Sequence, residues 1–227
     1  MLIIENGRVI DPRFGIDKVM DLAVDHGKIL DMGAGLREKY LHGASDIGAD
    51  TNIAASVIDA SGLVVAPGLI DVHVHFRDPG FTYKEDIQTG AKAAAKGGFT
   101  TVICMANTKP PVDNVETLEY VISEGKKTGI HVLTAANITV GMKGEVLTDM
   151  ELLKAHGAAG FTDDGIPLKD AALVQKAMEE AVRLNVPLSF HEEDPSLIEN
   201  NGINRGEVSR QLGIGGSPAA AEDVLVA

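Results

Sequence analysis

The spacing of hydrophobic and polar residues changes near residue 66. Before that point, short runs such as LIIENGRVI and DLAVDHGKILDMG alternate apolar and polar positions and are separated by turn-forming pairs such as Asn6-Gly7. Period-two alternation between such turns is typical of half-buried strands in hairpins. We therefore expect residues 1–66 to form a small β domain, an antiparallel and sandwich-like arrangement. Residues 36–55 show no clear period and give no structural prediction.

After residue 66 the pattern predicts alternating strands and helices. Apolar runs favour strands at 69–76, 100–107, 131–138, 158–164 and 187–193. The segments between them have helical spacing, at about 83–96, 114–127, 147–156 and 168–184. Thr82 with Glu85 has the spacing of a capping box at the first helix, and Gly97 is suited to its end. These are repeated βα units, about five in all.

Repeated βα units form either a doubly wound sheet or a (β/α)8 barrel. No Gly-rich phosphate loop follows the first strand, as a nucleotide-binding sheet would require. Instead, several strands end in polar residues, which is typical of the mouth of a barrel. We therefore predict an α/β fold, a partial TIM-type barrel over residues 67–227. The last helical segment has Ser217 as a candidate N-cap and no C-cap before Ala227, so we expect the chain to cover about five-eighths of the barrel.

Composition excludes several classes of function. The formal charge is −13, from 33 acidic and 20 basic residues, and no basic cluster is present, which disfavours nucleic-acid binding. No apolar stretch approaches the roughly 20 residues of a membrane span, and the N-terminus lacks the features of a secretory signal. We therefore expect a cytoplasmic protein. The single cysteine, Cys104, is expected to be a small buried core residue rather than a nucleophile.

His73 and His75 in the run DVHVHFRDPG are two residues apart, so on a strand they point to the same side, while Val72 and Val74 point to the other. Two imidazoles on one side of a buried strand fit a divalent metal such as zinc. A pair of hydrogen-bonded core histidines is the alternative, because the motif is short. Arg77 shares their side by parity, and it forms either a salt bridge at the rim or a bidentate contact with a substrate carboxylate.

Later strands end in further candidates. Asp163 and Asp164 follow one strand and His191 follows the next, so a barrel would bring them to the same mouth as the histidine pair. Only one of the adjacent aspartates can face inward, and we expect the other to cap the turn into Gly165. Asn107 is either a substrate-binding amide or a turn residue before Thr-Lys-Pro-Pro.

The segments GLIDVHVHFRDPG, MANTKPP, GFTDDG and SFHEED, in this order, resemble the dihydroorotases of the amidohydrolase superfamily, in the bacterial class whose bridging metal ligand is an aspartate. The resemblance covers the whole chain. It implies a site with one or two Zn²⁺ ions, with His73 and His75 on the first metal, Asp164 as the bridge and His191 on the second. His75, Arg77 and Asn107 would contact a small anionic substrate, with Arg77 and Asn107 holding its carboxylate.

The implied reaction is the reversible interconversion of L-dihydroorotate and N-carbamoyl-L-aspartate in pyrimidine biosynthesis. The family takes a further metal-binding histidine from its sixth strand and a proton-transferring aspartate from its eighth, and both would lie beyond Ala227. We therefore expect residues 1–227 alone to be inactive. The family also suggests a homodimer or a complex with aspartate transcarbamoylase.

Two alternatives remain at this stage. Hydantoinases and allantoinases hydrolyse related cyclic amides, but they use a carboxylated lysine as the bridge, and GAAGFTDDG has no lysine. A catalytically incomplete relative could instead serve as a structural partner of another pyrimidine enzyme. The intact His73, His75, Asp164 and His191 weigh against that second alternative.

Overall fold

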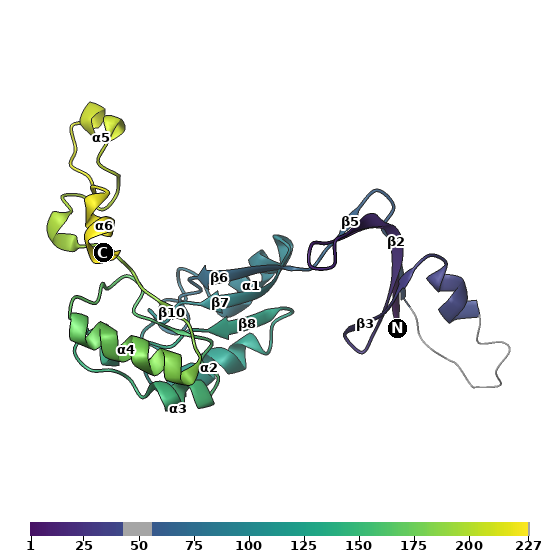
Figure 1. The fold of residues 1–227 in the computed structure, drawn as a ribbon, viewed down its shortest axis with the longest axis horizontal. Coiled ribbons are helices and arrows are strands. Elements are labelled where there is room, and N and C mark those ends of the chain that lie inside the picture. The colour runs from purple at the N-terminus through teal and green to yellow at the C-terminus, as the bar shows by residue number, and fades with distance from the viewer. Residues whose placement is uncertain (43–55, 227) are drawn as a thin grey trace. The chain divides into compact units, whose positions relative to one another are not determined.

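The computed structural model describes residues 1–42 and 56–226, and its contacts divide the chain into two compact units, Met1–Gly68 and Leu69–Ala227 (Figure 1). The predicted boundary at residue 66 lies within the first of these units. Within residues 36–55, which have no clear period, a short π-helix covers Glu38–His42, and residues 43–55 lie outside the described part of the chain. None of the described helices is long and apolar enough to span a membrane.

In the described residues of the first unit there is one five-stranded sheet with the order β3-β2-β1-β4, in which β5 also pairs with β1. Its strands are β1 (Leu2–Asp11), β2 (Ile16–Asp25), β3 (Lys28–Gly33), β4 (Ser56–Asp59) and β5 (Val64–Val65). The pairs β1–β2 and β2–β3 are antiparallel, as predicted. The pairs of β1 with β4 and with β5 are parallel, so the prediction of a wholly antiparallel sheet is wrong. A sandwich-like domain would need a second layer of strands, whereas the described residues form this one sheet.

The second unit contains five parallel strands in chain order. They are β6 (Leu69–Val74), β7 (Phe99–Cys104), β8 (His131–Thr134), β9 (Phe161–Thr162) and β10 (Leu188–Ser189). One sheet has the order β6-β7-β8, another pairs β9 with β10, and a parallel bridge between Ala136 and Phe161 links the two.

Helices follow these strands in turn: α1 (Ile87–Lys96), α2 (Val115–Gly125), α3 (Met150–Ala155) and α4 (Ala171–Leu184). The last described segment holds α5 (Glu207–Leu212) and α6 (Ala220–Val226), and short 3-10 turns lie at Val140–Met142 and Pro195–Leu197. Parallel strands in sequential order, each followed by a helix, form the predicted partial (β/α)8 barrel.

The start of α1 differs from the prediction. Its N-cap is Asp86, whose side chain accepts a hydrogen bond from the backbone N–H of Thr89, while the Thr89 hydroxyl faces the Asp86 N–H. This is a capping box shifted from the predicted pair of Thr82 and Glu85, and the helix therefore begins at Ile87. Gly97 is the C-cap, as predicted.

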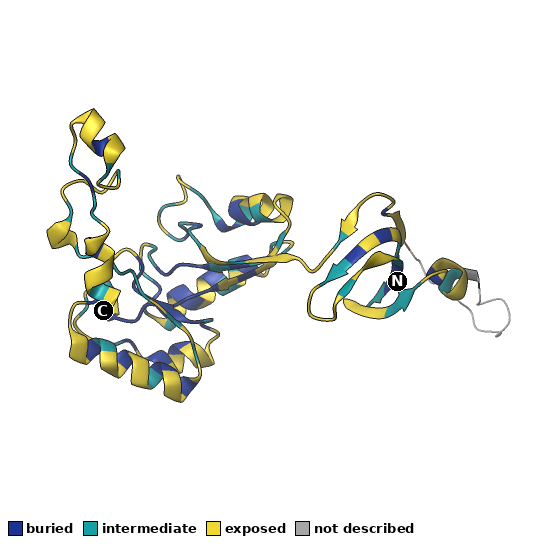
Figure 2. Ribbon diagram, turned by 45° about the horizontal axis from the view of Figure 1, so that its top comes forward, coloured by how far each residue is buried: buried dark blue, intermediate teal, exposed yellow. Residues whose placement is uncertain are grey.

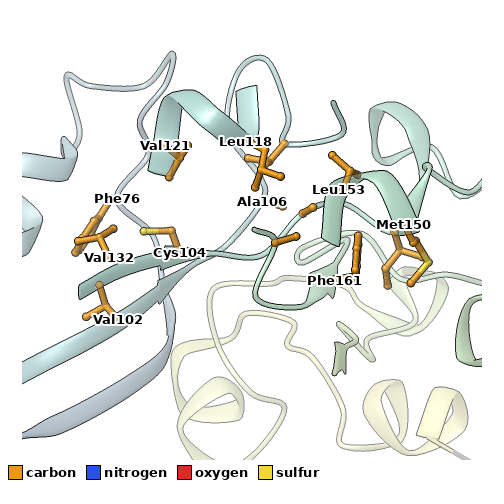
Figure 3. Close-up of a cluster of buried hydrophobic side chains, with 14 of the residues drawn as sticks. Phe76, Val102, Cys104, Ala106, Leu118, Val121, Val132, Met150, Leu153 and Phe161 are labelled. Carbon is orange, nitrogen blue, oxygen red and sulfur yellow. The ribbon is translucent and has the colours of Figure 1, made fainter. Parts of the chain in front are cut away.

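The core of the second unit lies between the sheet and the helices (Figure 3). Cys104 is part of it, and burial raises the pKa of its thiol to about 12, so the prediction of a buried core residue is confirmed. Along α4 the buried residues recur every three or four positions and form one apolar stripe, as the burial colours show (Figure 2): Leu173, Ala177, Ala181 and Leu184. This packing fixes the strand ends from which the polar side chains project.

Candidate metal centre

The four predicted metal ligands lie together at the carboxyl ends of β6, β9 and β10. Asp164 is central to the group. Its Oδ1 lies 3.4 Å from Nε2 of His73 and 3.7 Å from Nδ1 of His191, and its Oδ2 lies 3.4 Å from Nε2 of His75. Ligand atoms of His73, His75 and Asp164 all lie within 4.8 Å of one another, close enough to hold one metal ion. His191 borders this group on the side of Oδ1.

An irregularity in β6 sets the direction of the first histidine. The register between β6 and β7 shifts between Asp71 and Val74, as it does at a β-bulge. Val72 and His73 consequently line the same cavity, about 320 Å³ in volume, whereas Val74 packs against the core on the helix side. The prediction from parity is therefore wrong for Val72 and right for Val74. The rings of His73 and His75 still converge, with centroids 5.1 Å apart.

Asn107, after β7, joins two of the candidate ligands. Its amide nitrogen donates to Asp164 twice, to Oδ2 at 2.9 Å and to the backbone oxygen at 3.2 Å. Because both partners are acceptors, the nitrogen of the amide must face Asp164, and the amide oxygen must face His75. That oxygen lies 3.1 Å from Nδ1 of His75, so Nδ1 carries the proton. Nε2 of His75 is then an unprotonated nitrogen that points at Asp164.

The electrostatic surroundings of His75 favour its neutral form. Burial lowers the pKa of His75, and the charge of Arg77 acts in the same direction, while the hydrogen bond with Asn107 and the charge of Asp164 act against them. Neutral imidazole is the form that binds metal. The unprotonated Nε2 of His75 therefore cannot donate a hydrogen bond to the Asp164 carboxylate.

The neighbouring aspartates at the end of β9 have opposite surroundings. Asp163 is 2% exposed, and its carboxylate accepts hydrogen bonds from Asn137 Nδ2, from the backbone N–H groups of Ile138 and Thr139, and from the Thr139 hydroxyl. Burial raises the pKa of Asp163 in spite of these bonds. The side chain thus ties the loop after β8 to β9. The prediction that it caps the turn into Gly165 is wrong, because its partners belong to residues 137–139.

Arg77 lies beyond the end of β6, in a left-handed conformation with φ of 60°. Strand parity does not extend to it, because β6 ends at Val74. Its side chain is partly exposed, and the guanidinium makes no ion pair within residues 1–42 and 56–226. The charge is therefore available to a ligand, although the sequence argument that placed it on the inward side was not sufficient.

The loop that carries Arg77 is joined to the loop after β7. The backbone N–H of Lys109 donates to the Pro79 oxygen at 3.1 Å. Gly80 has φ of 91°, and a Cβ there would lie 2.0 Å from the Lys109 oxygen. Only glycine fits this contact. Asp78, next to Arg77, is buried and accepts a hydrogen bond from the Tyr120 hydroxyl at 2.9 Å.

His191 has a second carboxylate beside it. Nε2 of His191 lies 3.3 Å from Oε2 of Glu193, and the other oxygen of Glu193 accepts a hydrogen bond from the Ser217 hydroxyl at 3.3 Å. Ser217 was predicted to cap the last helix, but α6 begins at Ala220, and Ser217 pairs with Asn204 instead. The sequence alone does not show which member of the acidic run Glu192, Glu193 and Asp194 contacts His191.

These ligand atoms fit a divalent cation. A carboxylate that is 9% exposed faces imidazole nitrogens at 3.4–3.7 Å, at least one of them without a proton. Acceptors gathered in this way repel one another unless a cation lies among them. Imidazole and carboxylate ligands suit zinc, among other divalent metals.

Two comparisons with known proteins agree on the family. Residues 62–227 match the family model described as dihydro-orotase-like. All 227 residues align with a dihydroorotase of Clostridioides difficile at 56% identity and with one of Clostridium acetobutylicum at 52%. The alignments cover 51% and 50% of those proteins, so the chain spans about half the length of the curated relatives it matches.

Among solved structures, the chain resembles an L-hydantoinase of Arthrobacter aurescens, with a TM-score of 0.64 at 22% identity over 86% of this chain and 41% of that one. A D-hydantoinase of Thermus sp. gives the same TM-score at 23% identity, over 87% and 41% of the two chains. These identities establish a shared fold and no more. The family model and the curated relatives show that the chain belongs to the dihydro-orotase-like family.

Proposed function

We propose that the protein containing this chain is a dihydroorotase, which interconverts L-dihydroorotate and N-carbamoyl-L-aspartate in pyrimidine biosynthesis in the cytoplasm. The observation that carries the proposal is the 56% identity to a curated dihydroorotase across all 227 residues. The gathering of His73, His75 and Asp164 around one point supports it, because hydrolysis of a cyclic amide at neutral pH needs an activated water.

In this proposal zinc is held by His73, His75, Asp164 and His191, as one or two ions. When bound, zinc supplies Lewis acidity toward the ring carbonyl and lowers the pKa of water. The residues of the chain have the task of holding the substrate. Arg77 would pair with the substrate carboxylate through two parallel hydrogen bonds, which the absence of a described ion pair leaves it free to make.

Asn107 would assist Arg77 at the same carboxylate. Both amide hydrogens of Asn107 already point to Asp164, so a hydrogen bond to substrate requires that one of these contacts be given up. The proposal therefore gives Asn107 two tasks, at the ligands and at the substrate. Truncating Asn107 to alanine should weaken zinc binding and raise the KM for dihydroorotate.

Partners are also part of the proposal. Membership in the family suggests a homodimer or a complex with aspartate transcarbamoylase. Light scattering of the purified full-length protein, alone and mixed with that enzyme from the same cell, tests both. A monomeric mass that does not change on mixing would contradict both the homodimer and the complex.

The proposed activity is tested with the full-length protein that carries residues 1–227. Dihydroorotate, hydantoin and allantoin are offered separately, before and after the metal is removed with a chelator and restored as zinc. Turnover of dihydroorotate alone, lost with the metal and recovered with zinc, is expected. Turnover of hydantoin or allantoin in preference to dihydroorotate would overturn the assignment, and zinc-free protein from a careful purification would favour a structural role.

A further inference from the structure

The ring of His191 lies between two carboxylates, one at each nitrogen. Nδ1 is 3.7 Å from Oδ1 of Asp164, and Nε2 is 3.3 Å from Oε2 of Glu193. Glu193 belongs to the loop after β10, and ligand atoms of His73, His75 and Asp164 group together without it. Its carboxylate therefore meets His191 at the nitrogen that does not face the candidate ligands.

Glu193 is itself held in place. Its side chain is 20% exposed, and its second oxygen accepts the Ser217 hydroxyl at 3.3 Å. The backbone of Ser217 is fixed on both sides, since its N–H donates to the Ile203 oxygen and its own oxygen accepts from the N–H of Arg205. These bonds connect His191 through Glu193 to the segment that precedes α6.

The adjacent carboxylate is used differently. Asp194 pairs with Lys169 at 3.1 Å and accepts the backbone N–H of Ser196, where it caps a 3-10 turn. Within the described residues, Glu193 has no ion pair with a lysine or arginine, and His191 is its one basic neighbour. A carboxylate accepts hydrogen bonds and cannot donate them, so the arrangement is favourable only when Nε2 of His191 carries the proton.

From this geometry we infer that Glu193, held by Ser217, is a positioning residue that fixes His191 as the Nε2–H tautomer and turns its unprotonated Nδ1 toward Asp164 for metal binding. The inference rests on the proposed metal site. It assigns His191 the opposite tautomer to His75, whose Nδ1 is protonated against Asn107 and whose Nε2 faces Asp164. The two histidines are thus prepared from outside the site by two different side chains.

The test measures zinc affinity in the full-length protein by competition with a chelator. Partners of this kind typically contribute 10–100-fold to metal affinity, so Glu193→Ala is expected to weaken zinc binding by roughly that factor. Glu193→Gln keeps an oxygen that accepts from Nε2–H, and it should restore most of the affinity. Ser217→Ala leaves the carboxylate in place but frees it to move, so its loss should be smaller than that of Glu193→Ala.

The matched control is Glu192→Ala, which removes the same charge one residue away. Glu192 makes no hydrogen bond or ion pair with His191 in the part of the chain that is described. A loss of affinity for Glu193→Ala that Glu192→Ala does not show supports the inference. Equal affinities for the two variants and the wild type would overturn it.

A second readout does not depend on affinity. Nitrogen-15 NMR of the zinc-loaded protein distinguishes the ring nitrogen of His191 that binds zinc, expected to be Nδ1, from the one that carries the proton, expected to be Nε2, in the wild type and in Glu193→Gln. A wild-type spectrum with the proton on Nδ1 would refute the inference even if Glu193→Ala failed to fold. Wild-type protein that binds no zinc would overturn the proposed function, whereas wild-type binding that Glu193→Ala matches would overturn the positioning role alone.

Discussion

Asp163 and Asp164 are adjacent, carry the same carboxylate and are both buried, yet they face different surroundings. The loop after β8 supplies Asp163 with hydrogen-bond donors from Asn137, Ile138 and Thr139. Among the residues that the structure describes, Asp164 receives one side-chain donor, the amide of Asn107, and otherwise faces imidazole nitrogens. A buried carboxylate whose hydrogen bonds the protein supplies serves the fold, and one that faces other acceptors requires a cation.

The end of β6 shows the same division. Asp78 accepts the Tyr120 hydroxyl and the backbone N–H of Ile87, while the neighbouring Arg77 has no described ion pair. At both strand ends, one charged residue of an adjacent pair is satisfied within the protein and the other is available to a ligand. Substitutions in each pair should therefore separate stability from binding.

The largest effect is expected for Asp164→Asn, which keeps the size of the side chain and removes its charge. Zinc affinity should fall by more than the roughly 100-fold loss seen for residues that only support a ligand, and turnover should fall with it. The unfolding transition of the metal-free protein should stay near that of the wild type. Full zinc content in this variant would contradict the role assigned to Asp164.

Asp163→Ala should act on stability. It leaves buried backbone and side-chain donors without an acceptor, which should lower the free energy of unfolding by about 3 kcal/mol. Urea unfolding of the metal-free protein measures it. Asp163→Asn, which retains one acceptor oxygen, is the control and should lose less. A change below about 1 kcal/mol for the alanine variant would show that the loop after β8 does not depend on this carboxylate.

Arg77→Met should act on substrate binding alone. Loss of a charge-assisted pair should raise the KM for dihydroorotate by roughly 10–100-fold, because hydrogen bonds to charged groups contribute about 1.5–3 kcal/mol. Zinc content and unfolding should be unchanged. Arg77→Lys keeps the charge without the bidentate geometry, so its KM should lie between those of the wild type and Arg77→Met. An unchanged KM would remove Arg77 from the substrate site.

Tyr120→Phe should give the smallest effect. Burial raises the pKa of Tyr120 to about 12, and its hydrogen bond to Asp78 acts in the same direction, so the phenol remains a donor below that pH. Because Tyr120 is 41% exposed, its loss should cost about 1 kcal/mol of stability and leave zinc affinity unaltered. A clear loss of zinc affinity instead would mean that Asp78 supports the metal site as well as the fold.

The sequence was sufficient for the strands and for the residues at their ends. Apolar runs predicted all five barrel strands, because a buried parallel strand needs such a run, and polar residues at successive strand ends indicated a barrel. The strand boundaries were less predictable. A bulge in β6 turns Val72 to the side of His73, and β6 ends at Val74, so alternation failed both there and at Arg77.

The contacts within the site could not be predicted in the same way. Asn107 lies between His75 and Asp164 because three strands place it there, and no local period contains that information. The donors to Asp163 come from a loop about 25 residues earlier, and Ser217, which meets Glu193, reads from its own sequence as a helix cap. The sequence around a strand end predicts which residue lies there, whereas the contact partner of that residue depends on the tertiary fold.

The contact between Gly80 and Lys109 limits how the substrate site can be redesigned. Any side chain at position 80 would push apart the two loops that carry Arg77 and Asn107, because the Lys109 oxygen occupies the space of its Cβ. Variant libraries that diversify one loop should keep this glycine. A graft from a relative with another substrate should transfer residues 77–81 and 107–110 as a single module.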